Sequence, residues 1–336
     1  MCLHDQTVLV TGGTGSFGKK FVQLALEDCH PKKIIIFSRD EFKQHEMRTS
    51  GFDQDCLRYF LGDVRDKDRL RRALDGVDIV IHAAALKHVP ACEYNPIEAV
   101  KTNVIGAANL IEAAIDRGVK KVLALSTDKA AAPVNLYGAT KLCSDKLLVA
   151  GNSYSGLHIT RFSVVRYGNV LGSRGSVVPL FQKLSATGSL PVTDPAMTRF
   201  WLTLDQGVRF VLHCLDFMEG GETFVPKIPS MSIMDLAKAI GPECDIKIVG
   251  IRPGEKIHEV LIPEDDARNT VEFADKFVIL PQFRPHVART YLSSNGGKLC
   301  PEGFRYSSDN NSQWLSVEEM RSLLDAYKQE GTPSDV

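Results

Sequence analysis

The sequence predicts an α/β fold, in which a doubly wound parallel sheet is followed by a smaller C-terminal α/β domain. Three observations predict this class. Short β-branched runs alternate with helical patterns through the first half of the chain, a glycine-rich turn follows the first run, and the alternation weakens after about Gly172. The chain has 336 residues, enough for one large α/β domain and a smaller second one.

Six apolar runs are expected to form the sheet. They are nearly continuous, which is typical of parallel strands that helices cover on both faces. The expected strands are residues 7–10, 33–37, 57–61, 79–82, 121–126 and 160–167. Between them, helical spacing of apolar residues predicts helices at 19–28, 66–74, 96–117 and 136–150. For the last of these helices, Pro133 is a start signal and Gly151 with Asn152 is a stop signal.

The second half is richer in Gly and Pro, and we expect three helices there. They lie at residues 205–217, 232–240 and 316–327, and Ser316 with Glu319 forms a capping-box pattern at the start of the last one. We therefore expect a first domain at residues 1–171, to which roughly 200–225 return, and a second domain at 172–336.

Composition excludes several classes of protein. A hydrophobic content of 44% and a charged content of 24% are ordinary for a globular protein, and 40 Lys and Arg against 41 Asp and Glu leave no net attraction for nucleic acid or an anionic membrane. The eight cysteines have no metal-ligand spacing, so no metal is expected. Without a long apolar run or a signal peptide, we expect a soluble, cytoplasmic chain with no membrane partner.

The first expected strand runs directly into the glycine-rich turn TGGTGSFG, residues 11–18. Glycine spacing alone usually marks only a turn, but between a strand and a helix it favours a pyrophosphate bound at the helix N-terminus. The turn therefore predicts a dinucleotide site. Its expected contacts are Gly12, Thr14, Gly15, Ser16, Phe17 and Gly18.

The end of the second strand selects between NAD and NADP. An acidic residue there usually binds the ribose 2′-hydroxyl of NAD. Here Ser38 is followed by Arg39 and Asp40, with Lys43 close behind. Two cations that can clamp a 2′-phosphate favour NADP, although Asp40 keeps NAD open. Further cofactor contacts are expected after the third and fourth strands, at Asp63, Val64, Ala83 and Ala84.

A second polar group follows the fifth strand. Ser126 and Thr127 end the strand, and Tyr137 and Lys141 lie one helical turn apart on the following helix, so they share a face. A phenol with a pKa of about 10 needs a nearby ammonium to act as a base at neutral pH. Beside a dinucleotide, Tyr137 would take the proton of a sugar hydroxyl that Thr127 or Ser126 holds, as hydride leaves the same carbon.

These features resemble those of the extended short-chain dehydrogenase/reductase family, whose members act on nucleotide sugars with a Rossmann domain. More narrowly, several segments are similar to those of the inverting UDP-N-acetylglucosamine 4,6-dehydratases of the pseudaminic acid pathway. These segments are SRDEFKQ, HAAALKHVP, STDKAAAPVNLYGATKL, RYGNVLGSRGSVVP, MTRFW and RPGEKIHE. The matching blocks run from about 7 to 262, with YSSDNN at 306–311, and little is recognised at 263–305.

The resemblance implies a reaction cycle and roles for Asp128 and Lys129. NADP oxidises C4 of the sugar, water is eliminated across C5 and C6, and hydride returns to C6 with inversion at C5. Lys129 would be the base at C5 and Asp128 the acid for the departing hydroxyl. Lys129 must then lose its charge, which we expect from a cationic neighbourhood of Lys141 and the cofactor. Adjacent strand residues point to opposite faces, so the chain must leave the strand by Asp128.

The nucleotide-sugar substrate requires local cations. Arg174, Arg199 and Arg252 lie in glycine-, proline- or aromatic-rich loops and are expected to contact the pyrophosphate. The resemblance implies that residues 1–171 bind NADP and that 172–336 bind the substrate. It adds four contacts, which are Lys87, Asn169 with its neighbour Val170, and Glu255. Lys87 would also approach the cofactor, while His82 and His88 are expected to pack or to support other groups.

The expected product is UDP-2-acetamido-2,6-dideoxy-β-L-arabino-hexos-4-ulose, an early intermediate for pseudaminic acid on flagellin or surface glycans. Relatives form dimers and hexamers, so a homo-oligomer is expected. Two alternatives stay open. One is a UDP-sugar 4- or 5-epimerase, which needs the same oxidation but not the Asp128 and Lys129 pair. The other is a non-catalytic, dinucleotide-sensing regulatory protein, against which the intact set of Tyr137, Lys141 and Thr127 argues.

Overall fold

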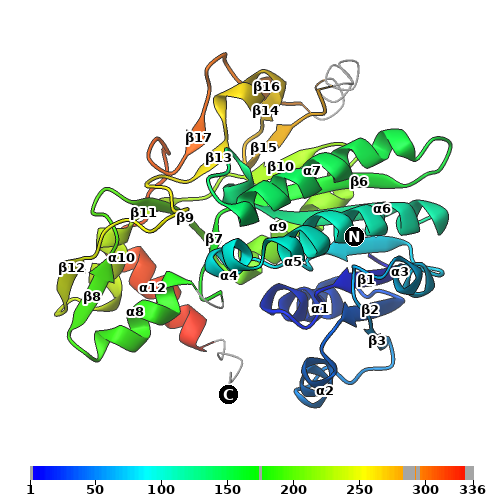
Figure 1. The fold of residues 1–336 in the computed structure, drawn as a ribbon, viewed down its shortest axis with the longest axis horizontal. Helices are drawn as coiled ribbons and strands as arrows, with labels where there is room; N and C mark the ends of the chain where they lie inside the picture. Colours follow the sequence, from blue (N-terminus) through cyan, green and yellow to red (C-terminus); the bar gives the residue numbers. More distant parts are fainter. Residues whose placement is uncertain (1–2, 174–175, 283–291, 293–295, 330–336) are drawn as a thin grey trace.

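The computed structural model describes residues 3–173, 176–282, 292 and 296–329 (Figure 1). Ten strands form its main sheet, which occupies the centre and right of the view. They are β1 (Thr7–Thr11), β2 (Lys33–Ser38), β3 (Leu57–Leu61), β4 (Ile79–His82), β5 (Lys121–Thr127), β6 (Arg161–Tyr167), β10 (Thr223–Pro226), β14 (Thr270–Glu272), β15 (Lys276–Ile279) and β16 (Lys298–Leu299). The six expected strands are confirmed to within one residue at each end.

The strand order is β16-β14-β15-β10-β6-β5-β4-β1-β2-β3. From β3 through β10 all neighbours pair in parallel, and the strands beyond β10 pair antiparallel. The part from β3 to β6 has the order of a Rossmann sheet, in which ligands bind beyond the carboxyl ends of the strands. The predicted doubly wound α/β fold is confirmed.

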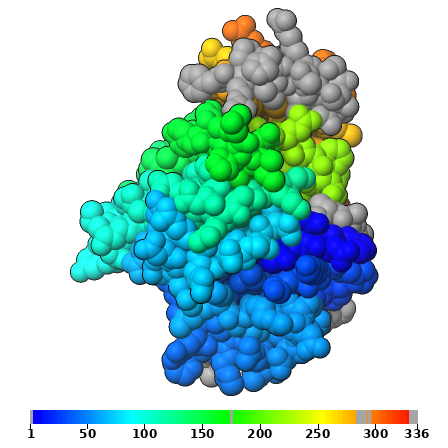
Figure 2. All heavy atoms as spheres, turned by 90° about the vertical axis from the view of Figure 1, so that its right-hand side faces the viewer, coloured from blue at the N-terminus to red at the C-terminus, as the bar shows by residue number. Residues whose placement is uncertain are grey.

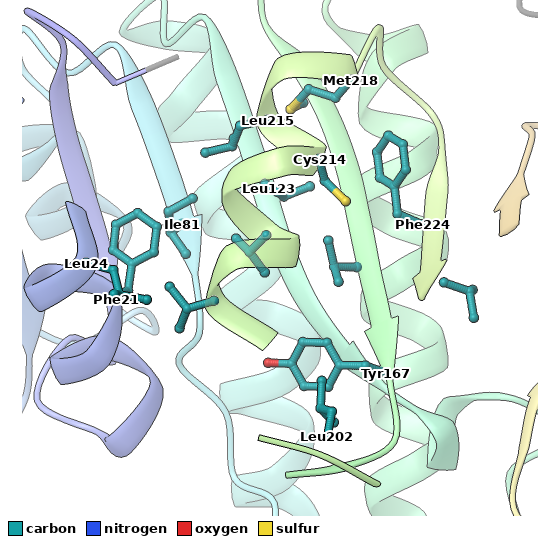
Figure 3. Close-up of a cluster of buried hydrophobic side chains, with 14 of the residues drawn as sticks. Phe21, Leu24, Ile81, Leu123, Tyr167, Leu202, Cys214, Leu215, Met218 and Phe224 are labelled. Carbon is teal, nitrogen blue, oxygen red and sulfur yellow. The ribbon is translucent and has the colours of Figure 1, made fainter. Parts of the chain in front are cut away.

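Helices cover both faces of this sheet. On one face, α1 (Ser16–Asp28) and α9 (Leu204–Phe217) pack against each other and against the central strands. Figure 3 shows Phe21 and Leu24 of α1 beside Ile81 of β4, and Leu123 of β5 beside Cys214 and Leu215 of α9. The other face carries α3 (Lys67–Ala73), α6 (Gly106–Asp116) and α7 (Leu136–Tyr154). Neighbouring strand residues divide between the two layers, because successive side chains point to opposite faces. The continuous apolar runs therefore fill two cores.

Two of the expected helices differ from the prediction. The pattern at 96–117 is α5 (Pro96–Val100), a π-helical turn η1 (Lys101–Ile105) and then α6. Helix α7 runs through Gly151 and Asn152 to Tyr154, so the expected stop signal was wrong. The amide of Asn152 instead faces inward and bonds both backbone groups of Phe162, at 2.8 and 3.0 Å.

Three short helices were not expected from the periodicity. They are α2 (Glu41–Thr49), α4 (Val89–Tyr94) and α8 (Val177–Ser185). The first two begin at side-chain caps, because Asp40 accepts from the backbone N–H of Lys43 and His88 accepts from that of Ala91. Each has too few turns for an apolar stripe to stand out, so local capping defines them better than periodicity does.

The smaller lobe, at the left of Figure 1, has its own apolar core. Helices α8, α10 (Ile233–Ile240) and α12 (Val317–Gln329) pack there around small sheets, with Trp201 and Phe181 almost fully buried. The strands of these sheets are β7 (Asn169–Val170), β9 (Thr198–Leu202), β11 (Ser230–Ser232), β8 (Ser189–Val192) and β12 (Asp245–Ile248). A separate pair joins β13 (Val260–Ile262) to β17 (Tyr306–Ser307).

More of the second half joins the main sheet than the sequence predicted. Helix α9 and strand β10 lie within the expected returning segment, but β14, β15 and β16 extend the same sheet, while β9 belongs to the smaller lobe. Sequence position alone therefore does not divide the chain at about residue 171. Across the described ranges, no helix combines the length and apolar character that a membrane span requires.

Candidate active site

A cleft of about 1910 Å³ lies between the carboxyl ends of the parallel strands and the smaller lobe. Every site residue predicted from the sequence lines it, apart from Arg174, which lies outside the described residues. The cleft thus brings together segments that are far apart in the chain, in the crevice where doubly wound sheets bind ligands. The roles of the individual residues remain predictions.

The glycine-rich turn joins β1 to α1 along one wall of the cleft. Gly12 has φ of +67°, and a Cβ there would lie 3.0 Å from the backbone of Ala84. A Cβ on Gly18 would lie 2.4 Å from the carbonyl oxygen of Gly13. A side chain at either position would therefore clash with nearby backbone atoms. No side chain caps α1, and its first turn has no acidic residue. This cradle fits the pyrophosphate of a dinucleotide.

The end of β2 carries the predicted 2′-phosphate contacts. Arg39 Nη1 lies 3.7 Å from Asp63 Oδ2, and Lys43 Nζ lies 3.5 Å from Asp40 Oδ2. Asp40 also caps α2 by accepting from the Lys43 backbone at 3.0 Å, and this bond is the main cause that holds its pKa below the usual value. Its carboxylate is therefore engaged locally, while both cations stay half exposed at the cleft.

Asp63 is a further residue that was expected to contact the cofactor. Its carboxylate accepts from Arg65 Nη2 at 2.7 Å and Nε at 2.9 Å. Burial raises the pKa of Asp63, but the bonds from Arg65 and the charge of Arg39 outweigh this and hold it below the usual value. The side chain is thus used inside the protein, although the segment that carries it still lines the cleft.

We call Thr127, Asp128, Lys129, Tyr137 and Lys141 the chemical centre. Its first three residues lie at the carboxyl end of β5. Strand β5 ends at Thr127, and a 3₁₀ turn (Asp128–Ala130) begins immediately, so the chain does leave the strand by Asp128. Thr127 Oγ1 donates to Asp128 Oδ1 at 2.9 Å, and Lys129 Nζ donates to the same oxygen at 3.0 Å. Asp128 is fully buried, whereas 28% of the Lys129 side chain is exposed to the cleft. Both groups therefore meet on one side of the turn.

Tyr137 lies in the first turn of α7, which Asn135 caps by accepting from the backbone of Gly138 at 2.8 Å. Burial raises the pKa of Tyr137 to about 12, while the charge of Lys129 and a hydrogen bond with Thr127 act in the opposite direction. The phenol is therefore protonated at neutral pH in this structure. It needs a further positive charge beside it to become a base.

Lys141 follows one turn later on α7 and is almost completely buried. Burial lowers its pKa, and the Asp145 carboxylate opposes this only in part. Asp145 is itself shared, because it accepts from Ser126 Oγ at 2.6 Å and lies 3.5 Å from Arg166 Nη2. Helix α7 thus presents Tyr137, Lys141 and Asp145 at a helical spacing that predicts one common face.

The surroundings of Lys129 contradict one expectation. Carboxylates, rather than the cations expected from Lys141 and a cofactor, lie next to its amine. Asp128 is at 3.0 Å and Glu259 at 3.4 Å. Burial lowers the pKa of Lys129, but the two carboxylates outweigh it and hold the pKa above the ordinary value. The free protein therefore holds Lys129 as an ammonium.

Arg199, a predicted pyrophosphate contact, has many partners within the protein. The guanidinium is buried, and it donates to the carbonyl oxygens of Thr198 at 2.7 Å, Ile257 at 2.9 Å and Lys256 at 2.9 Å. Its Nε lies 3.7 Å from Glu259. These contacts occupy the donors that a bidentate phosphate clamp would need, and the predicted pyrophosphate contact of Arg199 stays a prediction. The side chain fixes the loop that carries residues 256–259.

The other substrate contacts predicted in this lobe form a loop over the chemical centre. Arg252 is exposed, and its backbone N–H donates to Glu255 Oε2 at 3.3 Å. Lys256 Nζ donates to the carbonyl oxygen of Ala131 at 2.6 Å, and Asn135 donates to that of Gly254 at 2.8 Å. The loop is therefore attached directly to both ends of the 129–137 segment. Asn169 and Val170 line the cleft from β7, and Lys87 lines it from the loop after β4.

Three buried polar residues at the site were missed by the sequence reasoning. Asn103, in the π-helical turn, bonds both backbone groups of Leu86 and donates to Thr140 Oγ1 at 3.0 Å, which ties the loop after β4 to α7. Asp145 lies four residues after Lys141, so helical spacing alone could have found it. Glu259 ends the segment RPGEKIHE, and nothing local marks its side chain as a partner of Lys129.

The two histidines near the cleft are used inside the protein. His82 Nδ1 lies 2.8 Å from Thr11 Oγ1, and burial together with the Lys141 charge lowers the pKa of His82 to about 3. His88 caps α4. Among the described residues, no group of three or more His, Cys, Asp or Glu side chains is arranged to hold a metal ion.

A glycine-rich turn between a strand and a helix, together with a Tyr and Lys pair on a helix facing the same cleft, defines the class of Rossmann-fold enzymes that use a nicotinamide dinucleotide. Comparison with known proteins narrows this class. The family model of the polysaccharide biosynthesis proteins matches residues 8–281. A Campylobacter jejuni protein (serotype O:23/36, strain 81-176), UDP-N-acetylglucosamine 4,6-dehydratase (inverting), is 56% identical over 96% of this chain and 98% of its own length.

More distant matches cover the same fold. A Rickettsia canadensis UDP-glucose 4-epimerase is 40% identical over 95% of both chains. The X-ray structure of Pen from Bacillus thuringiensis superimposes with a TM-score of 0.87 at 38% identity, covering 97% of this chain and all of Pen. DesIV, the dTDP-glucose 4,6-dehydratase of Streptomyces venezuelae solved with NAD and TYD, has a TM-score of 0.68 at 26% identity, covering 86% and 97%. The chain belongs to the polysaccharide biosynthesis protein family, as a relative of the inverting UDP-N-acetylglucosamine 4,6-dehydratases.

Proposed function

We propose that the protein is a lyase that dehydrates UDP-N-acetylglucosamine to the UDP-4-keto-6-deoxy-hexose with inverted C5. The observation that carries the proposal is the pair of Asp128 and Lys129 at the end of β5, beside Tyr137 and Thr127. An oxidation site alone needs only the tyrosine, lysine and threonine. A buried carboxyl and an amine next to them supply the acid and the base that elimination of water requires.

Each side chain of the chemical centre has a separate role in the proposed reaction. Tyr137 takes the proton of the C4 hydroxyl, Thr127 orients that hydroxyl, and Lys141 stabilises the phenolate. NADP held by the glycine-rich turn, Arg39 and Lys43 would supply the hydride acceptor for C4 and the hydride donor for C6. Oxidation at C4 acidifies the C5 proton, which the amine of Lys129 removes. Asp128, in its protonated form, gives a proton to the departing C6 hydroxyl, which leaves as water.

NADP is proposed as the cofactor, because Arg39 and Lys43 remain available at the end of β2 while the Asp40 carboxylate caps α2. The test is titration of the apoprotein with NADP and with NAD by calorimetry. The unmodified chain should prefer NADP, and Arg39→Met should reduce that preference about tenfold. Equal affinity of the unmodified chain for both dinucleotides would contradict NADP selectivity.

Substrate contacts are proposed at Arg252, Asn169, Val170, Glu255 and Lys87, all of which line the cleft. With Arg199 committed to the protein, Arg252 is the exposed cation of the RPGEK loop that is left for the substrate pyrophosphate. In this proposal, residues of the first 171 bind the cofactor, and the smaller lobe binds the UDP moiety.

The decisive experiment is incubation of the purified protein with UDP-N-acetylglucosamine in deuterated water, followed by NMR of the product. The proposal predicts a 4-keto-6-deoxy sugar with deuterium at C5 and inverted configuration. Recovery of unchanged sugar would contradict it. Formation of the C4 epimer without loss of water would favour the second candidate, a UDP-sugar epimerase, which the 40% identical relative supports.

A homo-oligomer is also proposed. Helices α4 and α5 form the cyan projection in Figure 2, and the described apolar side chains Tyr94 and Ile97 are 88% and 63% exposed there. Apolar groups of this size on a projection are typical of a contact surface. Analytical ultracentrifugation should show more than one copy, and Tyr94→Lys should shift the protein toward a monomer. A cytoplasmic location and a role in pseudaminic acid synthesis complete the proposal.

A further inference from the structure

Glu259 is a buried carboxylate at the chemical centre with no part in the mechanism above. It precedes β13, and it is only 3% exposed. Its backbone is fixed on both sides by Ser308, whose Oγ accepts from the Glu259 N–H at 2.9 Å and whose N–H donates to the Glu259 carbonyl at 2.8 Å. The side chain reaches into the same cleft as Lys129. Its position is therefore set by the fold rather than by chance contact.

The carboxylate is only partly satisfied. Oε1 lies 3.4 Å from Lys129 Nζ and 3.7 Å from Arg199 Nε. Oε2 is buried and has no hydrogen-bond partner among the described residues. A buried carboxylate oxygen without a donor is costly, and the cost falls if the group can carry a proton.

Lys129 carries a proton that it must lose before it can act as a base. Two carboxylates hold it as an ammonium, yet removal of the C5 proton requires the neutral amine. Asp128 also has a buried oxygen, Oδ2, without a hydrogen-bond partner in the described part of the chain, and its Oδ1 accepts from Thr127 and Lys129. In the proposed cycle Asp128 receives its proton from Tyr137 through Thr127, so it is already protonated when Lys129 must lose a proton. Glu259 is the remaining acceptor in contact with the amine.

We propose that Glu259 is the proton-transfer partner of Lys129 in the C5 step, an inference that rests on the proposed function. One N–H bond of the ammonium breaks and an O–H bond forms on Glu259, which leaves both groups neutral. The Lys129 lone pair then takes the C5 proton, the C–H electrons form the C5=C6 bond, and the C6 hydroxyl leaves with the proton of Asp128. As the C6 position is reduced, a proton from solvent reaches C5 on the face opposite Lys129, which gives the inverted product. Glu259, in contact with Lys129, releases its stored proton to solvent. Tyr137 finally passes the C4 hydroxyl proton back to Asp128 through Thr127, which restores every group.

The test is Glu259→Gln, which keeps the size of the side chain but cannot accept the proton. Reduction of bound NADP, followed by nicotinamide absorbance, should proceed within about threefold of the unmodified rate. Exchange of the C5 proton with deuterium from solvent should fall about a hundredfold at neutral pH. The matched control is Glu264→Gln, a nearby exposed carboxylate that should change neither rate.

The pH profile separates proton transfer from a structural role. The charged and titratable groups around Lys129 are Asp128 on its own turn, Tyr137, Arg199, Lys256 and Glu259. In the Gln variant, Lys129 has lost one carboxylate and must give its proton to solvent. The slow C5 exchange should therefore recover as the pH is raised, whereas the unmodified protein should show no such recovery.

Three results would overturn the inference. Faster C5 exchange in Glu259→Gln at neutral pH would mean that Glu259 only restrains Lys129 in its charged form. Loss of NADP reduction together with C5 exchange would mean that Glu259 only supports the fold. C5 exchange within about threefold of the unmodified rate would mean that another group takes the proton. If the unmodified protein itself forms no 4-keto-6-deoxy sugar, the proposed function has failed, which is a different outcome from any of these.

Discussion

Two lysines of the chemical centre, Lys129 and Lys141, have pKa values shifted in opposite directions, although both are withdrawn from bulk water. Burial lowers the pKa of each. For Lys141 burial prevails, because its one opposing carboxylate, Asp145, is shared with Ser126 and Arg166. For Lys129 two carboxylates prevail, one from the same turn and one from a segment 130 residues later. The acid partners of each lysine, rather than its depth of burial, therefore set its charge at this site.

Replacement of Lys129 should have the largest effect. Lys129→Met removes the base at C5, so formation of the 4-keto-6-deoxy product should fall about a thousandfold. Oxidation at C4 should persist, because Tyr137, Thr127 and Lys141 remain in place. Stopped-flow absorbance of the nicotinamide and NMR of the product measure the two steps separately. An epimerase would keep its full activity in this variant, and that result would contradict the dehydratase proposal.

Replacement of Lys141 should affect the other step. Lys141→Met removes the cation that stabilises the phenolate of Tyr137, so reduction of bound NADP should slow about three-hundredfold. Lys146→Met is the control, because Lys146 is exposed on the same helix. If Lys141→Met reduces the cofactor at the normal rate but fails at C5, the two lysines have been assigned the wrong way round.

Replacement of Asp145 should sharpen the comparison by removing the carboxylate that Lys141 and Arg166 share. Asp145→Asn should destabilise the fold by about 3 kcal/mol, because two buried cations lose their partner. The pKa of Lys141 should fall further, so activity should be lost on the alkaline side at a lower pH than in the unmodified protein. Urea unfolding and a pH–rate profile measure the two effects. Asp116→Asn, which breaks an exposed pair with Arg71, should change little.

The smallest effect is expected for an ion pair near the surface, between Asp78 and Lys120. Asp78 accepts from the Thr7 backbone at 2.8 Å and lies 2.9 Å from Lys120 Nζ. Burial raises its pKa, but these two partners outweigh it and hold the pKa below the usual value. Asp78→Asn should cost about 1 kcal/mol at neutral pH.

The pH dependence of that difference provides its check. A lowered pKa in the folded state means that the stabilisation by Asp78 is present above the unfolded pKa of about 3.9 and is lost as pH falls through the folded value. Unfolding curves of the two proteins should therefore converge in acid. A difference that persists at low pH would mean that the carboxylate charge is not the cause.

The sequence predicted most of the fold for a physical reason. Continuous apolar runs and helical periodicity are local consequences of burying strands on both faces, so the six central strands could be found without the structure. Helix α2 was missed because a short helix shows its cap more clearly than its periodicity. The end of α7 was misplaced, because Asn152 is used as a partner of Phe162 rather than as a stop.

The site also has features that the local sequence predicts and features that depend on contacts between distant segments. By itself, the sequence determined the glycine turn, the spacing of Tyr137 and Lys141, and the strand-end pair of Asp128 and Lys129, because each depends on neighbours within one turn or one strand end. Only the tertiary structure decided that Arg199 donates to the loop that carries residues 256–259, and that Glu259 lies against Lys129. Charge and hydrogen-bond partners are contacts between distant segments, and the sequence carries no local signal for them.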